Sequence, residues 1–150
     1  MSDKNFIMPM SGELLSLEQV PDSNFSQKLL GDGFAVRLSG EVVVSPFSGV
    51  VIAAFPTGHA FIIRREDGLE VLIHIGLNSA GKADAFRMQI NKYDEVKQGD
   101  VLVYVDTNKL SDQQEDLISP IVFANPDIKI SLHKLNQAVM VGDDSAVTLD

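Results

Sequence analysis

The 150-residue chain contains no cysteine, few basic residues and no long apolar run. Without cysteine it has no disulfide and no thiol chemistry, which suits a cytoplasmic protein. Twelve Lys and Arg against 21 Asp and Glu give a net charge of −9, which disfavours nucleic acid and anionic membranes and favours a basic protein partner. No apolar stretch approaches the roughly 20 residues of a membrane helix, and the first ten residues lack the pattern of a signal peptide.

The remaining composition is that of one globular domain spanning residues 1–150. Hydrophobic residues make up 45% of the chain, enough for a sizeable core, and no linker or low-complexity segment divides it. The start, a Met with a polar lead-in, favours a natural single-domain chain over an excised piece.

Short apolar segments alternate with Gly and Pro turns along most of the sequence, which predicts an all-β fold. A Pro-x-Ser-Gly turn occurs at 9–12 and again at 46–49, and Gly-Asp turns at 99–100 and 142–143 each open a strand. These echoes predict a closed antiparallel β-sandwich or barrel, built by duplicating one strand-turn-strand unit. Strands are expected at 6–8, 13–17, 34–38, 41–44, 50–55, 59–65, 69–75, 86–90, 101–106, 121–124 and 145–150.

Helix signals are weak. Residues 18–30 are polar and predict a loop with about one helical turn. The best short helix is 109–117, with Ser111 as its expected N-cap, while 128–135 is compatible with more than one state.

Residues 59–65 and 69–75 form the clearest hairpin, with a histidine near each open end and Asp67-Gly68 as the turn signal. A four-residue loop would place His59 directly opposite His74, and a two-residue loop would make them diagonal neighbours on one face. A three-residue loop would put them on opposite faces. Two of these three registers bring two imidazoles together among apolar side chains.

Three kinds of chemistry suit a pair of adjacent imidazoles. Zinc binding needs three or four protein ligands, and here Glu70 would be the only nearby carboxylate. Hydrolysis with a histidine base has no accompanying Gly-x-Ser-x-Gly motif or Ser/His/Asp set. Transient phosphoryl transfer needs little beyond a nucleophilic imidazole, a second imidazole that holds a phosphoryl oxygen, and a partner that excludes water.

Two other features have simpler interpretations. His133 has no partner motif, and we expect a surface histidine. Gly31-Asp32-Gly33 is ordinary turn chemistry, although Asp32 has the charge to meet an arginine of a basic partner.

Several stretches together resemble a known family. They are Pro9-Met10-Ser11-Gly12-Glu13, Val20-Pro21-Asp22 with Phe25, Gly31-Asp32-Gly33-Phe34-Ala35, Ser45-Pro46 with Gly49, Thr57-Gly58-His59-Ala60-Phe61, Leu72-Ile73-His74-Ile75-Gly76, Val96-Lys97-Gln98-Gly99-Asp100 and Ser119-Pro120. In this order the chain resembles the glucose-family enzyme IIA component of the bacterial phosphoenolpyruvate-dependent sugar phosphotransferase system.

The resemblance implies a small antiparallel β-sandwich of the duplicated hybrid motif type. It further implies that His74 is the phosphorylated histidine, that His59 supports the phosphoryl group, and that Thr57 hydrogen-bonds His59. No metal or organic cofactor is implied.

The resemblance also implies a docking surface. Phe34, Phe55 and Phe61 would form its apolar rim, Asp32 its acidic contact, and Gly76 and Asn78 would lie beside the active histidine. Asn78 stands where the family commonly has an aspartate, so one acidic partner contact loses its charge.

The hypothesis is therefore a cytoplasmic, monomeric phosphocarrier. The implied donor is the histidine phosphocarrier protein, and the implied acceptor is the IIB domain of a sugar permease. An alternative is a regulatory module that docks target proteins according to the phosphorylation of His74. A metallopeptidase of related β architecture is a third hypothesis, disfavoured because the chain has no His-x-His motif.

Overall fold

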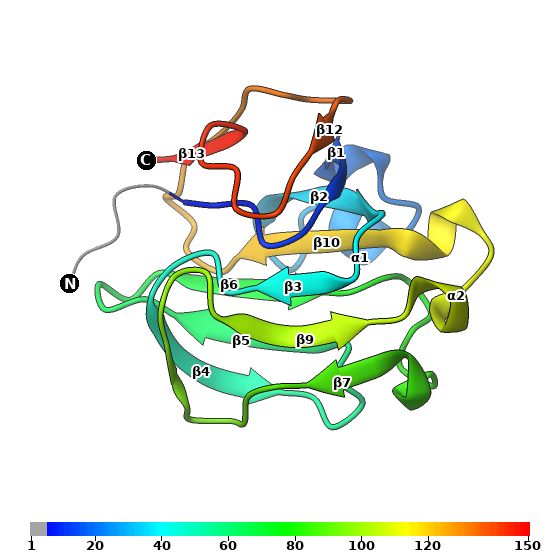
Figure 1. The fold of residues 1–150 in the computed structure, drawn as a ribbon. Helices are drawn as coiled ribbons and strands as arrows, with labels where there is room; N and C mark the ends of the chain where they lie inside the picture. The colour runs from blue at the N-terminus through cyan, green and yellow to red at the C-terminus, as the bar shows by residue number, and fades with distance from the viewer. Residues whose placement is uncertain (1–5) are drawn as a thin grey trace.

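The computed structural model describes residues 6–150, which form three antiparallel sheets and two short α-helices (Figure 1). The signal-peptide prediction concerned residues 1–10, and the first five of these lie outside the described part. The large sheet has the order β12 (Ala138–Val139), β1 (Gly12–Ser16), β2 (Asp32–Leu38), β10 (Ile118–Phe123), β6 (Glu70–His74), β5 (Ala60–Arg64), β4 (Gly49–Ala54) and β8 (Glu95–Val96). The smaller sheets are β3 (Val42–Val44), β9 (Val101–Val105) and β7 (Phe86–Met88), and β11 (Ile130–Leu132) with β13 (Val147–Leu149).

Two layers enclose the main core. In Figure 1 the β3–β9–β7 sheet lies over the part of the large sheet that contains β4, β5 and β6. Phe61 and Ile63 of β5 meet Val43 of β3 and Val103 of β9 in one buried cluster. The all-β sandwich predicted from the sequence is therefore confirmed, although residues 6–8 form no strand.

The other face of the large sheet has its own cover. Helix α1 (Ser23–Ser26) and the 3-10 turn η1 (Leu17–Gln19) bring Phe25 and Leu17 against Ala35 of β2 and Val122 of β10. The sheet is thus buried on both faces where β2 and β10 run, which explains why β10 is buried along its whole length.

The echoes in the sequence correspond to repeated backbone geometry. Met8 donates its amide to the Asp143 carbonyl at 2.9 Å and accepts from the Gly142 amide at 2.9 Å. Ser45 makes the same pair of bonds to Asp100, at 2.8 Å, and Gly99, at 2.9 Å. The strands that follow, β1 and β4, then pair with β12 and β8 in equivalent positions. This correspondence supports the duplicated unit predicted from the turns.

The helix predicted at 109–117 is wrong. The chain forms α2 (Thr107–Leu110), capped by the Asp106 side chain, and then the 3-10 turn η3 (Gln114–Leu117); a further 3-10 turn, η2, covers Ala83–Ala85. Ser111 ends α2 instead of starting a helix. Its hydroxyl accepts from the Gln113 amide and donates to Asp116, and such side-chain bonds compete with continuation of the helix.

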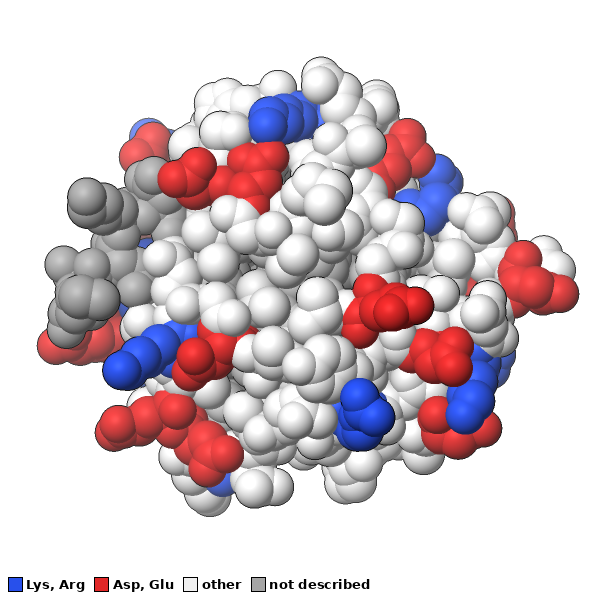
Figure 2. Space-filling model, in the orientation of Figure 1, with Lys and Arg blue, Asp and Glu red and all other residues white. Residues whose placement is uncertain are grey.

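The helices of residues 6–150 are all too short and too polar to cross a membrane. Figure 2 shows acidic and basic side chains scattered over one face, with uncharged surface between them. The net negative charge is therefore not offset by a basic patch on that face.

Candidate functional site

The β5–β6 hairpin has the register that we expected to separate the two histidines. Arg64 pairs with Glu70 and Ala60 with His74, and the Arg65 amide bonds to the Leu69 carbonyl at 2.8 Å, which leaves a three-residue loop. The rings of His59 and His74 nevertheless lie 5.2 Å apart between centroids, at 81°. The expectation of separation was wrong: His59 lies just before β5, where its carbonyl accepts the Ile75 amide at 2.7 Å, and its ring still meets the His74 ring.

The surroundings of His74 determine which ring nitrogen carries its proton. Its Nδ1 lies 2.8 Å from the Gly76 carbonyl oxygen. Since a carbonyl can only accept, Nδ1 carries the proton in the neutral ring, and Nε2 keeps the free lone pair. The Phe25 ring packs 5.6 Å from the His74 ring. The side chain is thus held in one orientation, with Nε2 as the nitrogen that does not face the Gly76 carbonyl.

A hollow of about 450 Å³ borders His74. Pro21, Asp22 and Phe25 form one wall, and residues 77–81 form the other. Asp22 caps α1 by accepting the Asn24 amide at 3.0 Å, so the helix start fixes the position of its carboxylate. Asp22 and Phe25 were not assigned a role from the sequence, because only the tertiary fold brings α1 to β6.

Both histidines have a pKa below the ordinary value of an imidazole. Burial lowers the pKa of His59 below its ordinary value, and the neighbouring His74 lowers it further. Burial also lowers the pKa of His74, partly opposed by the hydrogen bond to Gly76 and by the Asp22 carboxylate. A neutral imidazole has a lone pair to offer, so the lowered pKa values favour nucleophilic attack.

His59 is almost fully buried, with 7% of its surface exposed, and the Phe55 ring lies 5.4 Å away. Within residues 6–150 its Nδ1 has no hydrogen-bond partner. Thr57 does not supply the expected bond, since its hydroxyl donates to the Ala80 carbonyl at 2.9 Å. Thr57 therefore bonds to Ala80, which lines the hollow beside His74, and not to His59.

The predicted aromatic rim is only partly present. Phe55 is 43% exposed beside His59 and can meet a partner. Phe34 and Phe61 are completely buried, and Phe34 packs against Phe6 with ring centroids 5.8 Å apart. The expectation that Phe34 and Phe61 dock partners was wrong, because both side chains face the main core.

The polar docking residues differ in their distance from the histidines. Gly76 and Asn78 come two and four residues after His74. The side-chain amide of Asn78 donates from Nδ2 to Asp116 Oδ1 at 3.2 Å. Asp32 of β2 and Val71 of β6 both pair with Phe123 of β10, so they lie at the same level of the sheet. Val71 is three residues, or about 10 Å, along β6 from His74. Asp32 is ion-paired with Lys28 at 3.4 Å.

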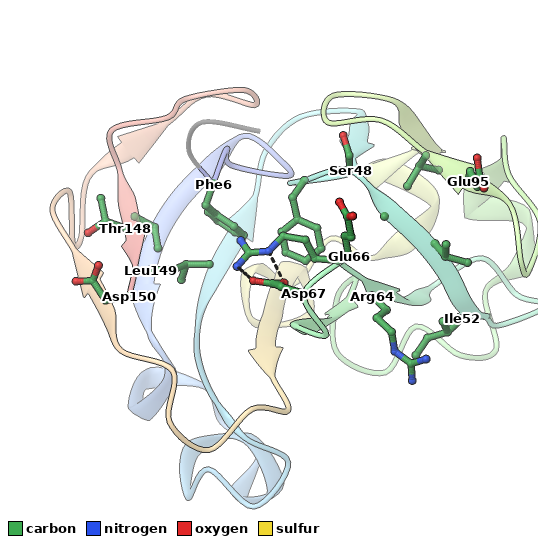
Figure 3. Close-up of a pocket in the computed structure, with 16 residues that line it drawn as sticks. Phe6, Ser48, Ile52, Arg64, Glu66, Asp67, Glu95, Thr148, Leu149 and Asp150 are labelled. Carbon is green, nitrogen blue, oxygen red and sulfur yellow. Dashed lines mark hydrogen bonds and ion pairs between the residues drawn. The ribbon is translucent and has the colours of Figure 1, made fainter. Parts of the chain in front are cut away.

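A larger hollow than the one beside His74 lies at the other end of the hairpin. It encloses about 1290 Å³, and the β5–β6 turn contributes Arg64, Arg65 and Asp67 to its lining. Arg65 is paired with Asp67, labelled in Figure 3, at 2.7 Å, and Arg64 is paired with Glu70 at 2.6 Å. Among the described residues, three further carboxylates, those of Glu66, Glu95 and Asp150, line this hollow and no histidine does, whereas His74 borders the smaller one.

Metal ligation has no support in the side chains. Across residues 6–150 no three His, Asp or Glu side chains are grouped so that they could hold a metal ion. His133 is exposed, and its Nε2 lies 2.9 Å from the Thr148 hydroxyl.

An open hollow beside a neutral, oriented imidazole, on an antiparallel sandwich with duplicated turns, defines a class of protein that transfers a small group through histidine. The comparisons identify the family within this class. Residues 4–128 match the family "phosphoenolpyruvate-dependent sugar phosphotransferase system, EIIA 1". The chain belongs to this family, as its resemblance to glucose-family enzyme IIA indicated.

Individual relatives agree with this assignment. A PTS system glucose-specific EIIA component of Staphylococcus epidermidis is 37% identical over 151 residues, covering 97% of this chain and 90% of the relative. A PTS system glucosamine-specific EIICBA component of Bacillus subtilis is 38% identical over 125 residues, covering 83% of this chain and 20% of that protein. The solved structure of glucose permease IIA from Mycoplasma capricolum matches with a TM-score of 0.87 and 34% identity, covering 96% of this chain and 94% of that one. The protein is accordingly a phosphocarrier component of a sugar phosphotransferase system, with a phosphoryl donor and a sugar permease as partners.

Proposed function

We propose that His74 is the residue that carries the phosphoryl group, on its Nε2. The observation that carries this proposal is the 2.8 Å hydrogen bond between Nδ1 and the Gly76 carbonyl, which leaves Nε2 as the free nucleophile. Its burial keeps the ring neutral, and the adjoining hollow of about 450 Å³ has room for a phosphoryl group.

The transfer proceeds by attack of the Nε2 lone pair on phosphorus. A bond forms between Nε2 and phosphorus while the bond from phosphorus to the donor's nitrogen breaks, and the donor ring recovers its electron pair. His74 keeps its Nδ1 proton throughout. Onward transfer reverses these roles, with His74 as the leaving group.

His59 has a supporting role in this proposal. Its ring centroid lies 5.2 Å from that of His74, so a phosphoryl oxygen on Nε2 comes within reach of its ring. A donor N–H aimed at this oxygen stabilises the charge that is shared during transfer. Thr57 would assist only after its hydroxyl leaves the Ala80 carbonyl.

The partners proposed are the histidine phosphocarrier protein as donor and the IIB domain of a sugar permease as acceptor. The Bacillus subtilis relative supports a link to a permease, because its name, EIICBA component, places EIIA with EIIC and EIIB in one protein. Phe55 is the exposed aromatic side chain that a partner would cover. We further propose that the protein acts in the cytoplasm as a monomeric domain.

The experiment is intact-mass analysis after incubation with phosphoenolpyruvate, enzyme I and the histidine phosphocarrier protein. The wild type should gain one acid-labile phosphoryl group, about 80 Da. His74→Gln should gain none, while His133→Gln, which changes an exposed histidine, should behave as the wild type. Labelling of His74→Gln, or no labelling of the wild type with several donors, would contradict the proposal.

A further inference from the structure

Ser119 connects the neighbouring strand β10 to the segment that orients His74. Its side chain is completely buried. The hydroxyl donates to the Leu117 carbonyl at 3.1 Å and accepts the Gly76 amide at 2.9 Å. The carbonyl of the same Gly76 accepts the His74 Nδ1 proton at 2.8 Å. A chain of three hydrogen bonds therefore runs from β10 to the imidazole.

Gly76 needs such an anchor because its backbone is unusually free. It has a φ of +74°, a region that glycine enters easily and leaves as easily. A Cβ at this position would lie 2.8 Å from the Asp116 carbonyl oxygen, so the turn has no side chain of its own to pack. The amide of the next residue, Leu77, bonds to that Asp116 carbonyl at 2.9 Å. Ser119 holds one side of Gly76, and Asp116 holds the other.

Loss of the Ser119 hydroxyl would leave the Gly76 amide buried without a partner. A buried, unsatisfied amide is costly, and a small rotation at Gly76 would relieve it by turning toward another acceptor. Such a rotation moves the carbonyl that holds the Nδ1 proton. The imidazole would then exchange between its two tautomers, because the hydrogen bond at one nitrogen decides which nitrogen carries the proton.

We propose that Ser119 is a positioning residue for phosphoryl transfer, which fixes the Gly76 carbonyl so that His74 keeps its proton on Nδ1 and presents Nε2. The inference rests on the proposed role of His74 and adds a residue that touches neither phosphorus nor partner. Ser119-Pro120 was noticed in the sequence as a family stretch, but no local pattern connects it to a histidine 45 positions earlier.

The test measures the His74 tautomer by nitrogen-15 NMR in the unphosphorylated full chain, together with the rate of phosphorylation. The wild type should show the Nδ1–H form alone. Ser119→Ala should show a mixture and lose about 10- to 100-fold in rate, the range seen when partners that orient functional histidines are removed. Ser119→Thr retains the hydroxyl and should restore both readouts.

Ser45→Ala is the matched control. Ser45 is also completely buried and its hydroxyl also donates to a carbonyl, that of Phe47 at 2.7 Å, but it lies by the other cavity. Its variant should lose stability without changing the tautomer. Should Ser119→Ala fail to fold, Ser119→Cys, with a weakly hydrogen-bonding thiol, should shift the tautomer in the same direction.

A single Nδ1–H tautomer with an unchanged rate in Ser119→Ala would overturn the inference. The tautomer is measured without any donor, so this outcome is distinct from a failure of His74 to accept phosphate. If the wild type were phosphorylated at a residue other than His74, the proposed function would be wrong. The tautomer measurement would still show whether Ser119 controls which ring nitrogen of His74 carries the proton.

Discussion

The His59 and His74 rings meet edge to face at 5.2 Å although the backbone partner of His74 is Ala60, not His59. The contact forms at the point where β5 begins, just after Gly58, whose φ is +90°. The pair therefore depends on how the chain enters the strand. One ring is fixed by a backbone carbonyl, and the other has a buried Nδ1 without a partner within the described residues. This asymmetry agrees with the proposed roles, His74 as the nucleophile and His59 as the supporting group.

The first prediction concerns His59→Gln. The nucleophile and its bond to Gly76 remain, so acceptance of the phosphoryl group should be partly retained. Onward transfer should fall about 100-fold, because a positioned donor to the phosphoryl oxygens is lost. Single-turnover transfer to a IIB domain, followed by mass spectrometry, measures both steps. Loss of all labelling in His59→Gln together with labelling of His74→Gln would reverse the two assignments.

The second prediction concerns pH. Both histidines have a pKa below the ordinary 6.5, mainly because they are buried. The unfolded chain therefore binds their protons more readily than the folded chain does. The resulting stability is complete above pH 6.5 and is lost as the pH falls through the folded pKa values.

NMR titration of the histidine resonances checks this sign directly. Midpoints for the pair in the folded protein should lie below those of the same residues in denaturant. The wild type should lose more unfolding free energy as the pH falls than a His59→Gln, His74→Gln double variant, which lacks the two titrating groups. A folded midpoint at or above the denatured one would refute the electrostatic account.

The sequence predicted those parts of the fold that depend on local pattern. Gly99-Asp100 and Gly142-Asp143 are turns that require a positive φ at glycine, and both adopt it, at +90° and +89°. Because each turn bonds to the residue before a Pro-x-Ser-Gly segment, the duplication was visible as repeated letters. The two histidines were singled out because they lie near the ends of one hairpin, but the hairpin has the register that was expected to separate them, so the pattern did not predict their contact.

The parts that failed depend on packing between distant segments. The family resemblance assigned Phe34 and Phe61 to a docking rim, and alternation along a strand could not show that both side chains are buried. The Ser111 hydroxyl bonds to Asp116, which ends a helix that composition alone would continue. Ser119 reaches Gly76 only through the pairing of β10 with β6.

The third prediction compares Phe55→Ala, which should weaken partner binding, with Phe34→Ala, which should lower stability. Phe55→Ala should change the free energy of unfolding by less than about 0.5 kcal/mol, since the side chain is 43% exposed. It should weaken partner binding about tenfold, the effect of losing an aromatic contact of about 1.4 kcal/mol. Phe34→Ala should instead cost about 3–5 kcal/mol of stability, because it empties a core position. Urea unfolding and the KM for the donor measure the two effects, and similar stability losses in both variants would exclude this division.

The last prediction concerns Asn78→Asp. Asn78 has a φ of +59°, a conformation that Asn and Asp both tolerate, so the turn should persist. The variant loses the amide that faces Asp116 Oδ1 at 3.2 Å and places two carboxylates together at the surface. The expected loss of stability is below about 1 kcal/mol, because water screens the pair. The added charge beside the hollow should lower the KM for a basic donor at low salt, and this gain should fade near physiological ionic strength. Asn78→Ala removes the amide without adding charge and is the control. If it lowered KM as much as Asn78→Asp, the effect would not be electrostatic.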